Sequence, residues 1–211
     1  MQGSSRGALA AATETLDAAL RSGADGSALG DELFAVIGAL DSSATLRRAV
    51  ADPSREPGAK AAIAQRLFGG RLSPAALGVL TSVVQQRWST ERDLADAVEN
   101  LGVQAVLADA DRAGRGDAVE DELFRFERIV AASPQLRDVV TDRTVPGSAK
   151  VALVDRLLVD KSSAQTLRLA RQAVSAPRGR RFARIIEDYL AIAAKRRSQV
   201  AATVTTAVAL D

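Results

Sequence analysis

The chain has 211 residues, of which 47% are hydrophobic, 26% are charged and 3% are aromatic, and its formal net charge is +2. This composition is ordinary for a folded protein, and the scarcity of aromatic residues favours helices over sheets. Because the sequence contains no Cys and no His, it excludes disulfides, thiol chemistry, Cys/His zinc sites and catalysis by histidine.

The small net charge conceals an asymmetry along the chain. Residues 1–117 carry 12 basic and 15 acidic side chains, a net charge of −3, whereas residues 118–211 carry 16 and 11, a net charge of +5. This division of sign suggests that the two halves offer different contact surfaces. The N-terminus lacks the pattern of a signal peptide and no segment reaches about twenty apolar residues, so we expect a cytosolic chain without membrane insertion.

The first clear element is an amphipathic helix, and its pattern occurs twice. Apolar residues spaced at 0, 4, 7 and 11 form one stripe of a helix, and this spacing is found in Leu29, Leu33, Val36 and Leu40 and again in Val119, Leu123, Phe126 and Val130.

This recurrence extends to a repeat with a constant offset of ninety positions. Residues 28–67 and 118–157 share identities throughout, including Asp-Glu-Leu-Phe in both, and breaks that contain Pro and Gly fall at equivalent places. We infer a tandem duplication and predict an all-α fold of two five- or six-helix bundles.

The paired acids Asp31-Glu32 and Asp121-Glu122 are the repeat's candidates for catalysis or metal binding. They are adjacent in sequence and expected in the first turn of a helix, where the macrodipole favours acids without any further role. We therefore predict no catalytic residue, no metal site and no cofactor.

A single helix is predicted between the two copies, from about residue 90 to residue 112, with Thr90 as its cap. Its two halves carry apolar clusters that face roughly 170° apart, so the first half would pack in one bundle and the second half in the other. A break into two helices at Gly102 is the alternative. Trp88 precedes this helix and is interpreted as packing a corner of the bundle, with partner contact as the alternative.

Two basic clusters stand out in the second half of the chain. The first consists of Arg178, Arg180, Arg181 and Arg184, and the second spans residues 195–197. Positive charge at a helix start opposes the macrodipole, so helix stability does not explain the first cluster. Nucleic acid, an acidic protein partner and a solvated surface are its possible roles, and the lack of an aromatic stacking platform argues against nucleic acid.

The last segment, residues 200–211, alternates with period two and is rich in β-branched residues, which predicts a strand. Because a lone strand is not stable, it either begins a small sheet domain that is cut short or pairs with another molecule. The predicted domains are residues 1–101, residues 102–199 and residues 200–211.

The second copy resembles a known family through "SPQLRDVVTDRTVPGSAKVALVDRLL" and "FARIIEDYLAIAAKRRSQVAATVTTAVAL". Its features are a Leu-Arg near a helix end, a loop with Pro, a Lys-led helix ending in Arg-Leu-Leu, and a closing helix with Tyr189. The pattern is similar to the delta subunit of bacterial ATP synthase, the counterpart of the oligomycin-sensitivity-conferring protein, in its actinobacterial form with an extra helical bundle. The Gly-Gly signature of the family's C-terminal domain is absent.

This resemblance implies a non-catalytic stator component of the peripheral stalk of proton-translocating ATP synthase, on the cytoplasmic side of the plasma membrane. It also implies two partners, the N-terminal helices of the alpha subunits and a b-type stalk subunit. A helical adaptor that binds nucleic acid or an acidic protein through Arg178–Arg184 is the alternative function.

By analogy with the family, the partner helix would bind between the first and fifth helices of a bundle. In the second copy this groove would comprise Leu101, Ala105, Leu107, Leu167, Ala170, Arg171 and Val174. In the first copy it would comprise Leu9, Ala12, Leu16, Leu77, Leu80 and Val84. Ordinary core packing is the alternative for both sets.

Overall fold

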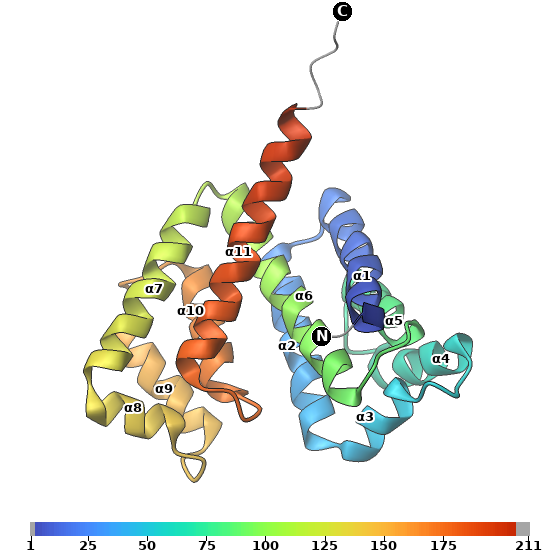
Figure 1. The fold of residues 1–211 in the computed structure, drawn as a ribbon, viewed down its shortest axis with the longest axis horizontal. Coiled ribbons are helices and arrows are strands. Elements are labelled where there is room, and N and C mark those ends of the chain that lie inside the picture. Colours follow the sequence, from blue (N-terminus) through green and yellow to red (C-terminus); the bar gives the residue numbers. More distant parts are fainter. Residues whose placement is uncertain (1–2, 206–211) are drawn as a thin grey trace, which may run out of the picture. The chain divides into compact units, whose positions relative to one another are not determined.

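The computed structural model of the chain describes residues 3–205, which form eleven α-helices and no strand (Figure 1). The helices are α1 (Gly3–Arg21), α2 (Gly26–Ser42), α3 (Ala44–Ala51), α4 (Pro57–Phe68), α5 (Pro74–Gln85), α6 (Glu91–Arg112), α7 (Gly116–Ala132), α8 (Pro134–Thr141), α9 (Gly147–Leu158), α10 (Ala164–Ser175) and α11 (Phe182–Thr205). The prediction of an all-α fold is confirmed.

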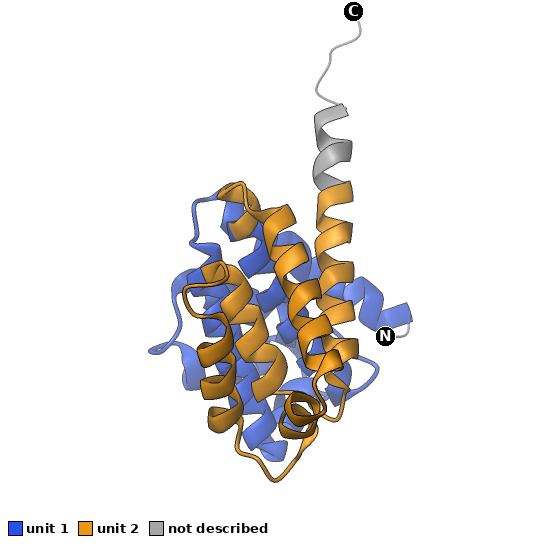
Figure 2. Ribbon diagram, turned by 90° about the vertical axis from the view of Figure 1, so that its left-hand side faces the viewer, with its two compact units in different colours: residues 1–109 blue, residues 110–211 orange. Residues whose placement is uncertain are grey.

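The helices belong to two compact units, residues 1–109 and residues 110–211, which Figure 2 distinguishes by colour. The first unit contains α1–α5 and most of α6, and the second contains the end of α6 and α7–α11. The domain division that the sequence suggests, after residue 101, therefore falls inside a helix. The tandem duplication stays a prediction from the sequence.

Helix α6 runs without interruption through Gly102, so the alternative of two helices broken at this residue is wrong. The glycine is explained by its neighbour α2: a Cβ atom at Gly102 would lie 2.6 Å from Cε1 of Phe34. In return, a Cβ atom at Gly30 would lie 2.4 Å from Cγ2 of Val106 and 3.0 Å from the carbonyl oxygen of Gly102. The two helices thus approach so closely that neither glycine has room for a side chain.

The apolar stripes predicted from the sequence form the cores of the two units. Each of these residues is at most 3% exposed: Leu29, Leu33, Val36, Leu40, Val119, Leu123, Phe126 and Val130. In the second unit Phe126 of α7 meets Phe182 of α11 edge to face, with 5.5 Å between the ring centroids. Burial of these stripes supplies the main driving force for folding of each unit.

The glutamate of each Asp-Glu-Leu-Phe segment caps a distant helix. In the first unit the carboxylate of Glu32 accepts hydrogen bonds from the backbone N and the Oγ of Ser73, at 2.7 and 2.6 Å. In the second unit Glu122 accepts the equivalent bonds from Ser163, at 3.0 and 2.8 Å. Ser73 and Ser163 are the N-cap residues of α5 and α10.

The expectation that these acids lie in the first turn of their own helix is wrong. Helices α2 and α7 begin at Gly26 and Gly116, which places Glu32 and Glu122 beyond their first turns. Each carboxylate instead accepts hydrogen bonds at the start of another helix, α5 in the first unit and α10 in the second. At a helix start, unpaired N–H groups and the positive end of the dipole favour a negative charge.

These contacts shift the pKa of Glu122 downward. Burial by itself raises this pKa, but hydrogen bonds from Oγ1 of Thr166 and from N and Oγ of Ser163 outweigh burial, so the carboxylate form is favoured.

Ion pairs attach the second half of helix α11 to other parts of the second unit. Near its end, Arg197 pairs with Asp117 at 2.9 Å and with Glu120 of α7, and Arg196 pairs with Asp111 at 3.7 Å. The basic residues 195–197 therefore include two that hold helices together.

The predicted C-terminal strand is wrong for the residues that the structure describes. Helix α11 continues to Thr205, and residues 206–211 lie outside the described range. The strand prediction counted β-branched residues, whose preference depends on a neighbouring strand. Residues 3–205 include no neighbouring strand, and extension of an existing helix adds a backbone hydrogen bond for each residue that it orders.

We expect Glu122→Gln to lower the free energy of unfolding by about 1–2 kcal/mol near neutral pH, because an amide replaces a charged acceptor at the start of α10. Since the pKa of Glu122 is lowered from its ordinary value of 4.5, its stabilisation is complete above that value and is lost as the pH falls through the folded pKa. Urea titrations across this range should show the difference from wild type shrinking with acid. Glu127→Gln on the same helix is the matched control, and a deficit unchanged in acid would contradict the assignment.

We expect opposite effects from alanine at two glycines of α2. Gly30→Ala should destabilise the protein by about 1–3 kcal/mol, because its Cβ collides with Val106 and the backbone of α6. A Cβ atom at Gly38 would have no other atom within 4 Å, so Gly38→Ala should stabilise the protein by about 0.5–1 kcal/mol through the higher helix propensity of alanine. Equilibrium unfolding in urea measures both, and equal effects would refute the close contact of α2 with α6.

Candidate functional site

The groove predicted for the first copy lies on two helices that pack directly against each other. Oγ1 of Thr15 in α1 is 3.0 Å from Oγ of Ser82 in α5, and these helices are neighbours along their length. Four of the predicted residues are at most 2% exposed and belong to the core: Ala12, Leu16, Leu80 and Val84. Leu9 and Leu77 are half-buried and are the members of this set that a partner can reach.

The residues predicted for the second copy's groove are divided between the two units. Leu101, Ala105 and Leu107 lie on α6 within the first unit, and all three are buried. The other four lie on α10 of the second unit: Leu167, Ala170, Arg171 and Val174.

On α10 itself, the predicted groove residues differ in exposure. Ala170 and Val174 are buried, whereas Leu167 and Arg171 are half-buried. Nε of Arg171 donates to Oδ1 of Asp155 in α9 at 2.7 Å. Leu167 is thus the apolar side chain of this set on α10 that remains accessible.

The first basic cluster occupies the turn between α10 and α11 and the first turns of α11. Arg178 and Gly179 adopt left-handed backbone conformations, with φ angles of 46° and 77°, which reverse the chain. Arg180 and Arg184 both pair with Asp188, at 3.9 and 3.0 Å.

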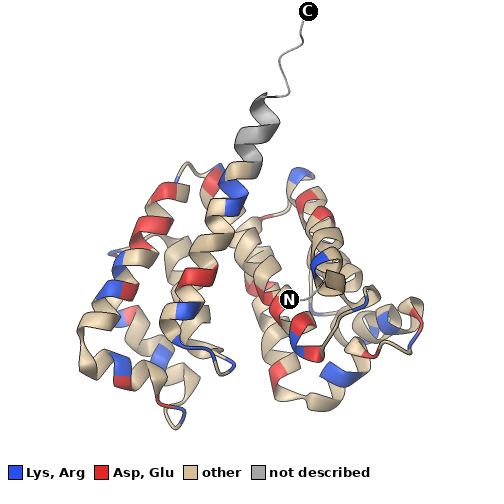
Figure 3. Cartoon of the chain, in the orientation of Figure 1, with Lys and Arg blue, Asp and Glu red and all other residues tan. Residues whose placement is uncertain are grey.

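Acidic residues of α11 thus offset the arginines at its start, and Figure 3 shows both signs of charge along this helix. The cluster is not one uninterrupted positive surface. This arrangement does not resemble the continuous basic stripe with which proteins neutralise nucleic acid phosphates.

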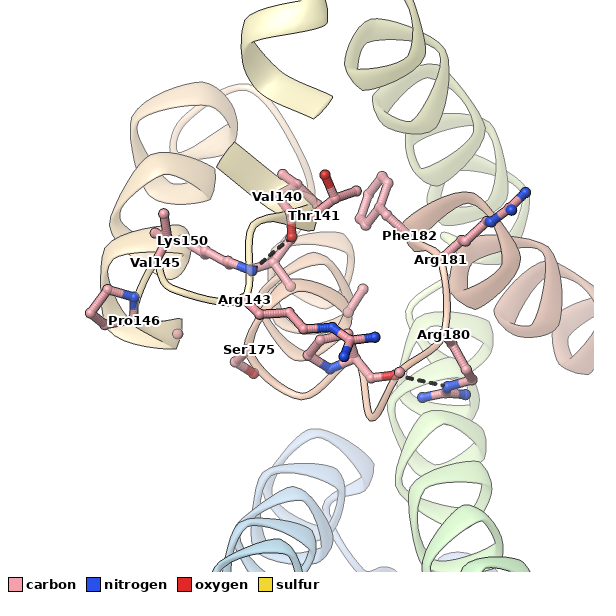
Figure 4. A pocket seen from close by; sticks show the side chains of 15 residues that line it. Val140, Thr141, Arg143, Val145, Pro146, Lys150, Ser175, Arg180, Arg181 and Phe182 are labelled. Atoms are coloured by element: carbon pink, nitrogen blue, oxygen red, sulfur yellow. Dashed lines mark hydrogen bonds between the residues drawn. The ribbon is translucent and has the colours of Figure 1, made fainter. Parts of the chain in front are cut away.

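A hollow that sequence reasoning missed lies in the second unit (Figure 4). Its volume is about 710 Å³, and two segments far apart in sequence form its walls, residues 140–150 and residues 173–182. We call it the basic hollow, because four cationic side chains line it: Arg143, Lys150, Arg180 and Arg181. The two breaks that contain Pro and Gly in the second copy were its only sequence signal, and nothing in the sequence shows that they meet.

Lys150 is the most deeply placed cation of the basic hollow. Its side chain is 4% exposed, and Nζ donates to the carbonyl oxygen of Val140 at 2.8 Å. Lys60, at the same place in the first copy, is 1% exposed, but its Nζ donates to the carbonyl oxygen of Gln86 at 2.8 Å. Burial lowers the pKa of Lys60. Both units therefore bury a lysine, yet they direct it to different carbonyl groups.

Two classes of feature are absent from the described part of the chain. Across residues 3–205, no group of three or more acidic side chains is arranged to hold a metal ion. Within the same range, no helix is both long enough and apolar enough to cross a membrane.

Comparison with known proteins agrees with the resemblance seen in the sequence. Residues 103–211 match the family described as ATP synthase delta (OSCP) subunit. A protein of Kineococcus radiotolerans is 48% identical over 99% of this chain and 76% of its own length. A protein of Acidothermus cellulolyticus is 48% identical over 100% of this chain and 78% of its own length. A protein of Streptomyces avermitilis is 47% identical over 99% and 77%. All three are named ATP synthase subunit delta, and from this agreement along nearly the whole chain we conclude that it belongs to the ATP synthase delta (OSCP) subunit family.

Proposed function

We propose that this protein is a stator component of proton-translocating ATP synthase, which holds the catalytic head to the b-type stalk by binding N-terminal helices of the alpha subunits. Its family membership makes it a structural subunit of the synthase and not an enzyme. The observation that carries the proposal is the similarity to ATP synthase delta subunits along almost the entire chain. We place it peripherally, at the cytoplasmic side of the plasma membrane.

Half-buried leucines on two units support helix binding at two places. Leu9 and Leu77 lie on α1 and α5 of the first unit, and Leu167 lies on α10 of the second. An amphipathic partner helix places apolar side chains at intervals of three and four residues onto such a surface. Each unit has a buried core of its own, so the partner would add to a folded surface and need not complete it.

Two contacts of this kind on one chain favour a durable attachment. Each alone buries few side chains, so each should be of modest affinity. When two contacts engage helices of one catalytic head, the second becomes intramolecular, and the combined affinity exceeds that of either. A static link that resists the torque of a rotor benefits from this gain.

The alternative of nucleic acid binding through residues 178–184 has no observation in its favour. Arg180 and Arg184 share Asp188 as an ionic partner, and the one aromatic side chain among residues 178–184, Phe182, is 6% exposed and offers bases no stacking surface. The one Trp, Trp88, is 5% exposed, and its Nε1 donates to the carbonyl oxygen of Val83.

We predict that the intact chain binds two copies of a fluorescently labelled peptide that carries the N-terminal helix of the alpha subunit. Leu77→Glu in the first unit and Leu167→Glu in the second should each remove one binding site, because each places a charge in an apolar contact. Fluorescence anisotropy titrations at protein concentrations well above the Kd would count the sites.

Exposed leucine and isoleucine elsewhere provide matched controls. Leu67 on α4 is 46% exposed and Ile129 on α7 is 52% exposed, so Leu67→Glu and Ile129→Glu test the effect of added charge at unrelated positions. Both should leave the stoichiometry at two. A single site that is insensitive to Leu77→Glu would disprove the two-groove arrangement and leave the family assignment untouched.

A further inference from the structure

The basic hollow of the second unit has features that the proposed helix contacts do not use. It is formed by the end of α8, the start of α9, the end of α10 and the turn that leads into α11. Among the residues of the two predicted grooves, it shares only Val174. It is therefore a distinct surface, and its lining indicates what it can bind.

Positive charge in the basic hollow exceeds the negative charge around it. The Nζ of Lys150 has three protons to donate, and its one hydrogen-bond acceptor among the described residues is the carbonyl of Val140. Arg143 is exposed and has no ionic partner within the described chain. Figure 4 shows the side chain of Arg143 extending over the hollow, whereas the guanidinium of Arg181, at the edge of the lining, points away from Arg143.

The two nearby carboxylates are already engaged. Asp142 accepts hydrogen bonds from N and Oγ1 of Thr144, both at 2.7 Å, and these bonds lower its pKa, with a smaller contribution from Lys150. Asp188 is shared by Arg180 and Arg184. No residue that lines the hollow is acidic.

The backbone at the start of α9 adds to this preference for negative charge. Its N-cap residue is Pro146, which makes no side-chain capping bond, so the first N–H groups of α9 have no partner of this kind. Gly147, the first residue of the helix, lines the hollow. The positive end of the α9 dipole therefore acts together with Arg143 and Lys150.

The remaining wall is apolar, and this distinguishes a peptide from a simple anion. Val145 is half-buried and Pro146 is exposed, and both line the hollow. Beneath them the lining continues into the core through the buried side chains of Val140, Val174 and Phe182. Inorganic phosphate would leave this surface uncovered. A peptide that presents a carboxylate beside a large apolar side chain would satisfy both walls, and the volume of about 710 Å³ is sufficient for a few side chains.

The first unit has different residues at the corresponding corner. At the offset of ninety, Arg143 corresponds to Pro53, and Arg180 and Arg181 correspond to Thr90 and Glu91. The ammonium of Lys60 binds Gln86 at the end of α5. The cationic lining is therefore particular to the second unit, as is expected for a site with a task of its own.

We propose that the basic hollow binds a short acidic and apolar segment of a partner protein. The carboxylate of that segment pairs with Arg143 and reaches Lys150 and the start of α9, while its apolar side chain packs on Val145 and Pro146, the more exposed apolar residues of the lining. This contact is additional to the binding of alpha-subunit helices and does not depend on it.

The test uses the full chain and a pool of labelled, end-blocked nonapeptides in which Asp or Glu adjoins Leu, Ile or Phe, with an Asn and Gln pool for comparison. We expect the acidic pool to contain members that bind with micromolar Kd, and the amide pool to bind at least about tenfold more weakly. Failure of every acidic peptide to bind at about 1 mM would overturn the proposal.

Substitutions locate the binding site. Arg143→Gln should weaken binding about tenfold, whereas Arg181→Gln should change it less than about twofold, because its side chain points away from Arg143. Arg156→Gln, at an exposed position of α9 outside the hollow, is the control of equal charge change. Equal losses in all three variants would show diffuse attraction and overturn the proposal, as would a larger loss at Arg181 than at Arg143.

Two competing ligands, added to the labelled peptide, distinguish the proposed peptide site from a site for another class of ligand. Inorganic phosphate that displaces the peptide with a comparable Kd would show a simple anion site, and an oligothymidylate that binds more tightly through Arg143 would show a nucleic acid site. Either result overturns the proposal. Binding of the alpha-subunit peptide should be the same in Arg143→Gln and wild type, so failure here is distinguishable from failure of the two-groove arrangement.

Discussion

A carboxylate that caps the start of a helix some forty residues further along the chain is the interaction on which both units depend. Glu32 holds Ser73 and Glu122 holds Ser163, in each case through the backbone N and the side-chain Oγ. This contact fixes where α5 begins relative to α2 in the first unit, and where α10 begins relative to α7 in the second. Because α5 and α10 carry Leu77 and Leu167, it also sets the position of the leucines that we propose for partner binding. A charged acceptor suits this position, because it satisfies N–H groups that no other part of the helix can satisfy.

The two units share the hydrogen bonds of one turn and differ at the surfaces that we propose for partner binding. Asp52 accepts hydrogen bonds from N and Oγ of Ser54, and Asp142 accepts them from N and Oγ1 of Thr144. The turn after α3 in the first unit and the turn after α8 in the second therefore have the same hydrogen bonds. The buried lysines differ: Lys60 binds the carbonyl that follows α5, whereas Lys150 binds one in α8. A turn can retain its hydrogen bonds while nearby side chains change, because the turn depends on two or three adjacent residues. Interaction surfaces, which draw residues from several segments, can therefore differ between units that share their framework.

Local patterns were predictable from the sequence, and long-range ones were not. The stripe of Leu29, Leu33, Val36 and Leu40 was identified because helical periodicity is contained within a dozen residues. The role of Glu32 as a cap was not predicted, because its partner Ser73 lies 41 residues away. An acid near a helix start also has a simpler local explanation. The strand predicted for residues 200–211 is wrong over residues 200–205 for a related reason. The prediction used the β-propensity of the residues without knowing whether a neighbouring strand is present, and that propensity depends on such neighbours. The basic hollow could not be predicted, because it exists only where residues 140–150 meet residues 173–182. For the candidate grooves, which rest on analogy with the family and stay a prediction, the sequence could not separate core residues such as Leu16 from accessible ones such as Leu77.

That separation has a consequence for how a stator attachment can work. The core of the first unit buries four residues of the predicted groove, Ala12, Leu16, Leu80 and Val84. The half-buried apolar side chains of this set are therefore Leu9 and Leu77. A surface of this size gives limited affinity, because hydrophobic stabilisation scales with the area removed from water and association carries its own entropic cost. Enlarging one groove would require apolar surface that is exposed whenever the partner is absent, and large exposed patches promote aggregation. Several small contacts on one chain, as we propose, would avoid this conflict. Each surface would be small enough to stay exposed without promoting aggregation, and the attachment would be tight because all of its contacts must open together for the chain to leave.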